Sequence, residues 1–216
     1  DRRYDYVQAH SFNPQSTSED SGLSAQIDWN IDDLTLTSIT AYRSFDLTDH
    51  IDADFSDLDG LEDFSDAEQE QFSQELRLSY VGERLNYVVG ANYFQQSLDS
   101  VTRLEFGEDT EFFAGVFSGL FPASGVGGAV FPADGFAYDI NEQDHKSWAL
   151  FGQADYALTD TLTLTAGLRY SDEHKELSTQ YFESGNEIGF NLSDFPATQK
   201  RSNVDETIDD DQTTGT

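Results

Sequence analysis

Apolar and polar residues alternate with a period of two in six segments of this 216-residue chain. Thr, Tyr, Val, Ile and Leu at this spacing are typical of β-strands with one apolar and one polar face. The six predicted strands span Leu23–Ile31, Leu34–Phe45, Phe72–Val81, Leu85–Gln96, Ser147–Leu158 and Thr161–Ser171. The pattern therefore predicts an all-β protein.

Short and long connections alternate between these strands. Two or three residues, such as Asp32 and Asp33, join the two members of each of three pairs, as in tight hairpins. Long acidic stretches at Asp46–Gln71 and Ser97–Lys146 separate the pairs. An antiparallel up-and-down sheet would place all short turns at one end and all long loops at the other. We expect three hairpins within residues 22–171, and a long loop or a truncated end over residues 172–216.

The charged residues of the predicted strands share one parity. Leu, Val, Ala, Trp and Tyr fill most positions of the other parity, although Ser38 and Thr40 break this rule in the second strand. The charged positions are Asp28, Arg43, Glu75, Arg77, Asp155 and Arg169. A sheet with one apolar and one polar face is either a soluble β-sandwich or a membrane β-barrel with its apolar face toward lipid. In a barrel these six residues would face the lumen.

Strand length and the placement of aromatic residues favour the barrel. About 10 residues at roughly 3.3 Å each, tilted by about 40°, span about 25 Å, the height of an outer-membrane apolar band. Aromatic residues gather at the strand ends, where they would form two girdles at the membrane interfaces. The predicted interface aromatics are Trp29, Tyr80, Tyr87, Tyr93, Trp148, Tyr156 and Tyr170. Two-residue turns at one end and long loops at the other are rare in soluble sandwiches.

Composition excludes several other classes. With 42 acidic and 11 basic residues the formal charge is −31, so the chain lacks the basic surface needed to bind nucleic acid or anionic lipid headgroups. It has no Cys, which excludes disulfides, thiolate metal sites and Cys nucleophiles. No apolar run is long enough for a membrane helix. The chain does not begin with Met or a signal peptide, so we expect an excised section of a longer protein.

No motif predicts catalysis, a cofactor or a specific metal site. The carboxylates between His50 and Asp66 could bind calcium, but they lack the ligand order of an EF-hand. Pairs of acids are too numerous in this chain for any one pair to indicate acid–base chemistry. A soluble surface β-sandwich that binds carbohydrate or calcium is the alternative to the barrel. A small eight-stranded barrel would need further strands at Arg3–Ala9 and Leu177–Phe190.

The strands LTLTSITAYRSF, FSQELRLSY, YVVGANYF and ALFGQADYALTDTLTLTAGLRY resemble the barrel of TonB-dependent outer-membrane receptors. The resemblance covers Gly22 to Lys175 and implies that residues 1–216 are part of a barrel of about 22 strands. It also implies a plug domain and an energy-coupling partner of the TonB type, docked through an N-terminal part that this sequence lacks. The implied location is the outer membrane of a Gram-negative bacterium, in contact with lipid. The implied ligand is a scarce nutrient such as a ferric siderophore, and the ligand-binding residues are unknown.

Overall fold

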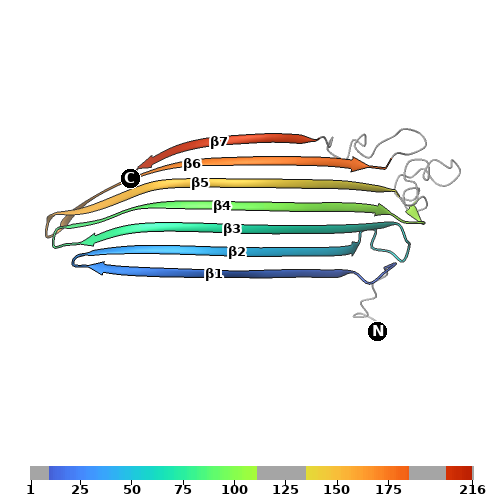
Figure 1. Ribbon diagram of the computed structural model, residues 1–216, viewed down its shortest axis with the longest axis horizontal. Helices are drawn as coiled ribbons and strands as arrows, with labels where there is room; N and C mark the ends of the chain where they lie inside the picture. The colour runs from blue at the N-terminus through green and yellow to red at the C-terminus, as the bar shows by residue number, and fades with distance from the viewer. Residues whose placement is uncertain (1–9, 111–134, 185–202, 216) are drawn as a thin grey trace.

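A computed structural model describes residues 10–110, 135–184 and 203–215 of the chain. They form one antiparallel sheet of seven strands in the order of the sequence (Figure 1). The strands are β1 (Gln15–Ile31), β2 (Leu34–Asp52), β3 (Leu61–Val81), β4 (Leu85–Phe106), β5 (Phe136–Thr159), β6 (Leu162–Glu183) and β7 (Val204–Gly215). The sheet is not closed, because β1 and β7 pair on one side only among the described residues. The predicted all-β, up-and-down architecture is confirmed.

Short turns occur at one end of the sheet, as the sequence predicted. Residues 32–33 join β1 to β2, residues 82–84 join β3 to β4, and residues 160–161 join β5 to β6. Asp32 has a φ of 51°, and the favoured two-residue hairpin turns need this left-handed backbone because it matches the twist of the strands. A register shift between Ala157 and Thr159 moves the third turn by one residue from the prediction.

The strands are longer than the six predicted segments. They contain 17 to 24 residues in β1 to β6, because each continues past the alternating segment toward the long connections. The predicted loop at Asp46–Gln71 is therefore mostly strand, and only residues 53–60 connect β2 to β3. Of the predicted loop at Ser97–Lys146, the residues up to Phe106 belong to β4 and those from Phe136 onward belong to β5.

The C-terminal expectation also needs correction. Residues 172–216 are not simply a long loop, because β6 continues to Glu183 and β7 adds a seventh strand paired with β6 over Leu168–Thr179. Leu177 lies within β6 and therefore does not begin a separate strand. The possible strand at Arg3–Ala9 lies outside the described residues.

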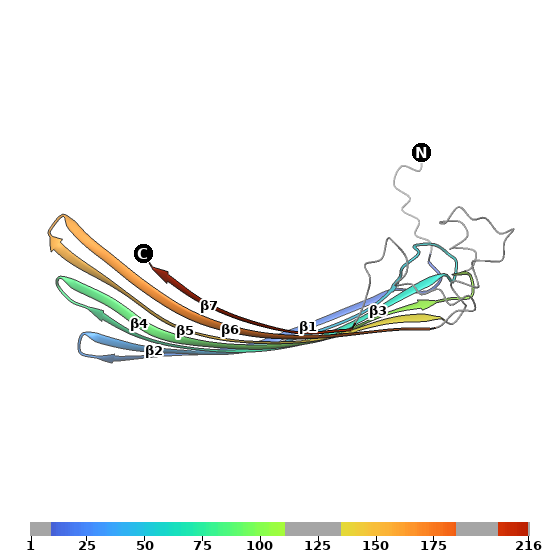
Figure 2. The same ribbon diagram turned by 90° about the horizontal axis from the view of Figure 1, so that it is seen from above.

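The sheet is a bowed single layer (Figure 2). Among the described residues only Phe106, Ala137 and Ala149 are buried apolar side chains, so no second layer covers either face. Along β5, even-numbered residues from Glu142 to Leu150 are exposed, and odd-numbered residues between them are partly or fully buried. Side chains crowd together on the concave face of a curved sheet and spread apart on the convex face. We therefore assign the more shielded face, which includes Ala149 at 1% exposure, as concave.

Candidate functional site

The convex face carries an uncharged, mainly apolar window on each of the first six strands. The windows contain nine residues on β2 (Leu34–Tyr42), β4 (Leu85–Tyr93) and β6 (Leu162–Tyr170). In each window the alternate residues that lie on the convex face, which we call the convex parity, carry no charge. Leu164 and Leu168 are 58% and 62% exposed. These residues would be buried in a sandwich, so the alternative of a soluble sandwich is wrong. The exposed apolar windows match the expectation for a face that contacts lipid.

The windows shift along the sheet in a regular way. We call residues level when successive direct pairs connect them across the sheet. In this sense Leu34 of β2 is level with Tyr87 of β4 and Ala166 of β6. The window on β4 begins two residues beyond that level, at Leu85, and the window on β6 begins four residues beyond it, at Leu162. The opposite edges shift equally, because all three windows have the same length. The uncharged band therefore runs obliquely across the strands.

This obliquity gives the tilt of the strands relative to the band. Two residues rise about 6.6 Å along a strand, and two strand spacings amount to about 9.6 Å. The edge of the band is therefore inclined by about 35° from the perpendicular to the strands. Strands of membrane barrels tilt by about 35–45°. Nine tilted residues span about 22 Å, close to the apolar height of about 25 Å in outer-membrane barrels. The geometry of the convex face is thus that of a lipid-facing barrel wall.

The predicted interface aromatics form two groups near the edges of the band. Near the short turns, the rings of Tyr80 and Tyr87 stack with centroids 5.3 Å apart. Near the long connections, Tyr93 pairs with Trp148, whose ring lies 5.5 Å from that of Tyr170. Trp29 and Tyr156 are exposed on the same convex parity, near the short turns.

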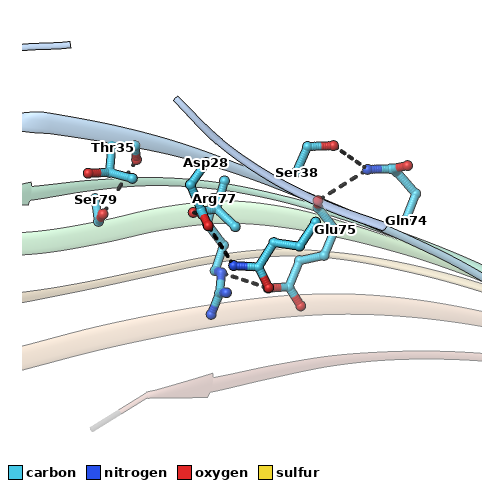
Figure 3. Close-up of polar contacts among 9 residues, drawn as sticks. Asp28, Thr35, Ser38, Gln74, Glu75, Arg77 and Ser79 are labelled. Atoms are coloured by element: carbon cyan, nitrogen blue, oxygen red, sulfur yellow. Dashed lines mark hydrogen bonds and ion pairs between the residues drawn. The ribbon is translucent and has the colours of Figure 1, made fainter. Parts of the chain in front are cut away.

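The six predicted lumen charges lie on the concave parity. Asp28 is level with Arg77 and Arg169, through Thr37, Gly90 and Phe151. Figure 3 shows Arg77 paired with Glu75, at 2.9 Å between Nε and Oε1. This is the only ion pair within the set of six.

The other four predicted lumen charges have partners outside the set. Asp28 and Asp155 each accept a 2.6 Å hydrogen bond from a threonine of the neighbouring strand, Thr37 and Thr165 respectively. Arg43 pairs with Asp20 of β1, and Arg169 lies over the ring of Phe151, 5.9 Å from its centroid. Asp20 was missed because it precedes the first alternating segment.

The two polar residues that break the apolar parity of β2 have a local explanation. The hydroxyl of Thr40 donates to Oε1 of Gln74 at 2.5 Å. The amide of Gln74 in turn donates to Ser38 Oγ at 3.1 Å (Figure 3). The three side chains share the convex face, and their mutual hydrogen bonds lower the cost of placing polar groups in an apolar band.

Beyond the band, toward the long connections, the convex face becomes acidic. At one level of the sheet six of the seven paired residues are acids, with Ser178 as the exception: Glu19, Asp46, Glu68, Asp99, Glu142 and Asp205. The concave face gains apolar residues over the same stretch, including Phe45, Leu98 and Leu177. The strands therefore continue with inverted polarity. The regular spacing of acids, as in Glu68 and Glu70, is the sequence feature that could have indicated strand there.

The carboxylates considered for calcium mostly organise the loop at residues 53–60. Asp54 accepts four hydrogen bonds, from the backbone and hydroxyl of Ser56 and from the backbone N–H groups of Gly60 and Leu61. Asp52 accepts two backbone N–H groups at 3.0 Å each. Within residues 10–110, 135–184 and 203–215, no group of three or more His, Asp or Glu side chains is placed to hold a metal ion.

One histidine joins β6 to β7 outside the uncharged band. Nδ1 of His174 lies 2.5 Å from the carboxylate of Asp209, and Nε2 lies 3.0 Å from Glu176. The hydrogen bond to Asp209, followed by that to Glu176, raises the pKa of His174 above its usual value. The protonated form therefore stabilises the pairing of these two strands.

No helix in the described part of the chain is long and apolar enough to cross a bilayer. No curated protein sequence matches the chain significantly. The ferric yersiniabactin uptake receptor FyuA from Yersinia pestis has a similar structure, with a TM-score of 0.64 and 14% identity over 94% of this chain and 25% of that chain. The siderophore receptor PiuA from Acinetobacter baumannii gives a TM-score of 0.60 and 15% identity, covering 94% of this chain and 30% of that chain.

At these identities the structural likeness concerns the fold. The chain spans 25% and 30% of the length of these two structures. A family model described as TonB dependent receptor-like, beta-barrel, matches residues 1–207, which is nearly the whole sequence. Both comparisons therefore agree with the oblique uncharged band. The chain belongs to the β-barrel family of TonB-dependent receptors.

Proposed function

We propose that this chain forms part of the wall of an outer-membrane receptor that imports an iron chelate of the siderophore type. The observation that carries the proposal is the uncharged band of nine-residue windows, whose oblique edges correspond to a strand tilt of about 35°, as in membrane barrels. Family membership adds the receptor class, since the family model and the similar structures are those of receptors rather than enzymes. The titles of the similar structures name ferric yersiniabactin and siderophores, and this supports iron chelates as cargo.

In this proposal the two faces of the sheet have separate roles. The convex face contacts lipid over the uncharged band, and the aromatic groups around Tyr80 and Trp148 lie at its two interfaces. The concave face lines the bore, where Asp28, Arg77 and Arg169 stay hydrated or hydrogen-bonded. The acidic extension of the strands and the connection at residues 53–60 lie on the outer side of the membrane. Energy for import comes through a TonB-type partner that docks outside the present residues.

The proposal is tested in a Gram-negative host that lacks its own iron-chelate receptors. Expression of the full-length receptor is expected to restore growth under iron limitation when ferric siderophores are supplied, and to fail in a matched strain without TonB. Membrane fractionation should place the protein in the outer membrane. Growth restored equally without TonB, or recovery of the protein as a soluble species, would contradict the proposal.

A further inference from the structure

Immediately beyond the uncharged band, the acidic residues of the three central strands β3, β4 and β5 lie on one face. Over four consecutive concave levels, from Ala67 to Ser73 on β3 and the residues paired with them on β4 and β5, there is no carboxylate. The three interleaved convex levels carry five: Glu68, Glu70, Asp99, Glu142 and Asp144. In a chain with 42 acids, this stretch of the concave face is unusual for its neutrality.

Side-chain amides dominate this neutral surface. Gln71 of β3, Gln96 of β4 and His145 of β5 are direct neighbours at one level. Gln69 and Gln143 lie one level farther from the short turns. We call Gln69, Gln71, Gln96 and Gln143 the amide wall. Because neighbouring strands lie about 4.8 Å apart, these groups fall within the reach of a single small molecule.

The amide wall has unused hydrogen-bonding capacity. None of its four amides has a hydrogen-bond partner among the described residues. Nε2 of His145 is buried without a hydrogen bond, and its nearest carboxylate, on Glu173, is 3.6 Å away. Two apolar side chains complete the surface: Phe94, whose ring lies 5.2 Å from that of His145, and Leu98 between Gln69 and Gln143.

The two basic residues beside the wall are each paired with an acid. Arg43, level with Gln71, is paired with Asp20. Lys175, level with His145, lies 3.3 Å from Glu173. An anionic ligand would therefore find no unpaired cation at this level. A neutral ligand with hydroxyl or amide groups could use the free donors and acceptors of the glutamines at no electrostatic cost.

We infer that the amide wall is a binding surface for an uncharged ligand rich in hydroxyl or amide groups, which contacts Phe94 and Leu98 with its apolar parts. This inference rests on the proposed receptor function and specifies the ligand class. An iron(III) trihydroxamate and a neutral oligosaccharide both have this chemistry. An iron(III) tris-catecholate, with a charge of −3, does not.

The test uses the full-length receptor in detergent micelles and measures binding of these three probes by calorimetry, with a maltooligosaccharide as the sugar. We expect a neutral probe to bind at least tenfold more tightly than the tris-catecholate. The double variant Gln71→Leu/Gln96→Leu should lose about tenfold in affinity for that neutral probe, since two hydrogen bonds are removed. The control Gln95→Leu changes the adjacent residue on the convex face and should bind like the wild type.

The outcomes separate the ligand class from the proposed function. Preference for the sugar over both iron complexes would support the amide wall and contradict iron import. Preference for the tris-catecholate would overturn the inference and leave iron import intact. Binding of no probe would also overturn the inference. Equal affinity of the double variant and Gln95→Leu for the preferred neutral probe would overturn it too, and this is the result expected if the glutamines contact an internal segment of the receptor instead of the ligand. Folding of each variant is checked by heat-dependent mobility in SDS gels.

Discussion

Two adjacent valines provide a direct test of which face contacts lipid. Val89 is the central residue of the window on β4, on the convex parity, and pairs with Leu78 and Gly152. Val88 lies on the concave parity and pairs with Ser79 and Gln153. The variants Val88→Arg and Val89→Arg therefore add the same side chain to opposite faces at almost the same depth.

The expected difference follows from the depth of Val89 in the band. Four residues separate it from each edge of its window, at Leu85 and Tyr93. This is about 13 Å along the strand, or about 11 Å perpendicular to the band at a tilt of about 35°. Arginine at the midplane of a barrel's lipid face costs about 2–4 kcal/mol. At position 88 the same side chain would reach water in the bore, so its cost should stay below about 1 kcal/mol.

The assay compares the full-length variants in lipid vesicles. The measured quantities are the fraction that folds, detected as the heat-modifiable band in SDS gels, and the denaturant midpoint of unfolding. Val89→Arg should shift the midpoint well below that of the wild type, and Val88→Arg should shift it little. A larger loss for Val88→Arg than for Val89→Arg would show that the faces are assigned the wrong way round and would refute the reasoning.

Two further variants test local features of the sheet. A Cβ at Gly90 would lie 2.6 Å from both a backbone carbonyl oxygen and the ring of Phe151, so Gly90→Ala should cost roughly 1–3 kcal/mol. Gly152→Ala, with its nearest atom at 3.3 Å, should be milder in the same unfolding assay, and equal losses would contradict the packing seen here. The hydrogen bond to Asp209 raises the pKa of His174. Protonated His174 therefore stabilises the pairing of β6 with β7 fully below about pH 6.5, and this stabilisation is lost as pH rises through the raised pKa. Hydrogen exchange in β7, corrected for intrinsic rates, should therefore increase as pH rises through the pKa of His174. The variant His174→Gln should abolish this pH dependence, and an unchanged pH profile in the variant would contradict the role of His174.

The membrane part of the sheet could be predicted from the sequence because lipid and water impose opposite demands on alternate residues. The short turns follow from the same pattern, since the windows end where Asp32 and Asp33 or Gly82 begin a connection. The third turn was displaced by one residue because the irregularity near Ala157 depends on the pairing of β5 with β6. A single strand carries no information about such a bulge.

The outer part of the sheet was missed for a different reason. Above the band both faces are near water, so polar residues occupy both parities and only a few apolar residues, such as Phe45 and Leu98, mark the inverted pattern. The strand β7 (Val204–Gly215) has almost no apolar residues and therefore gave no alternating pattern. The pairs Arg43–Asp20 and His174–Asp209 join residues 23 and 35 positions apart, and they depend on a strand register that the sequence does not specify.

The polarity inversion also bears on how such a sheet can be stable. A single layer with three buried apolar side chains among its described residues removes too little apolar surface from water to offset the conformational entropy of ordering the chain. Lipid on the convex face removes this requirement within the band, because exposed Leu and Val are favourable there. Above the band, where lipid ends, acids such as Glu68 and Asp99 keep the outer surface soluble, and residues such as Phe45 and Leu98 face inward. The positions at which the two faces exchange character therefore follow the oblique outer edge of the uncharged band, and the amide wall begins beside that edge.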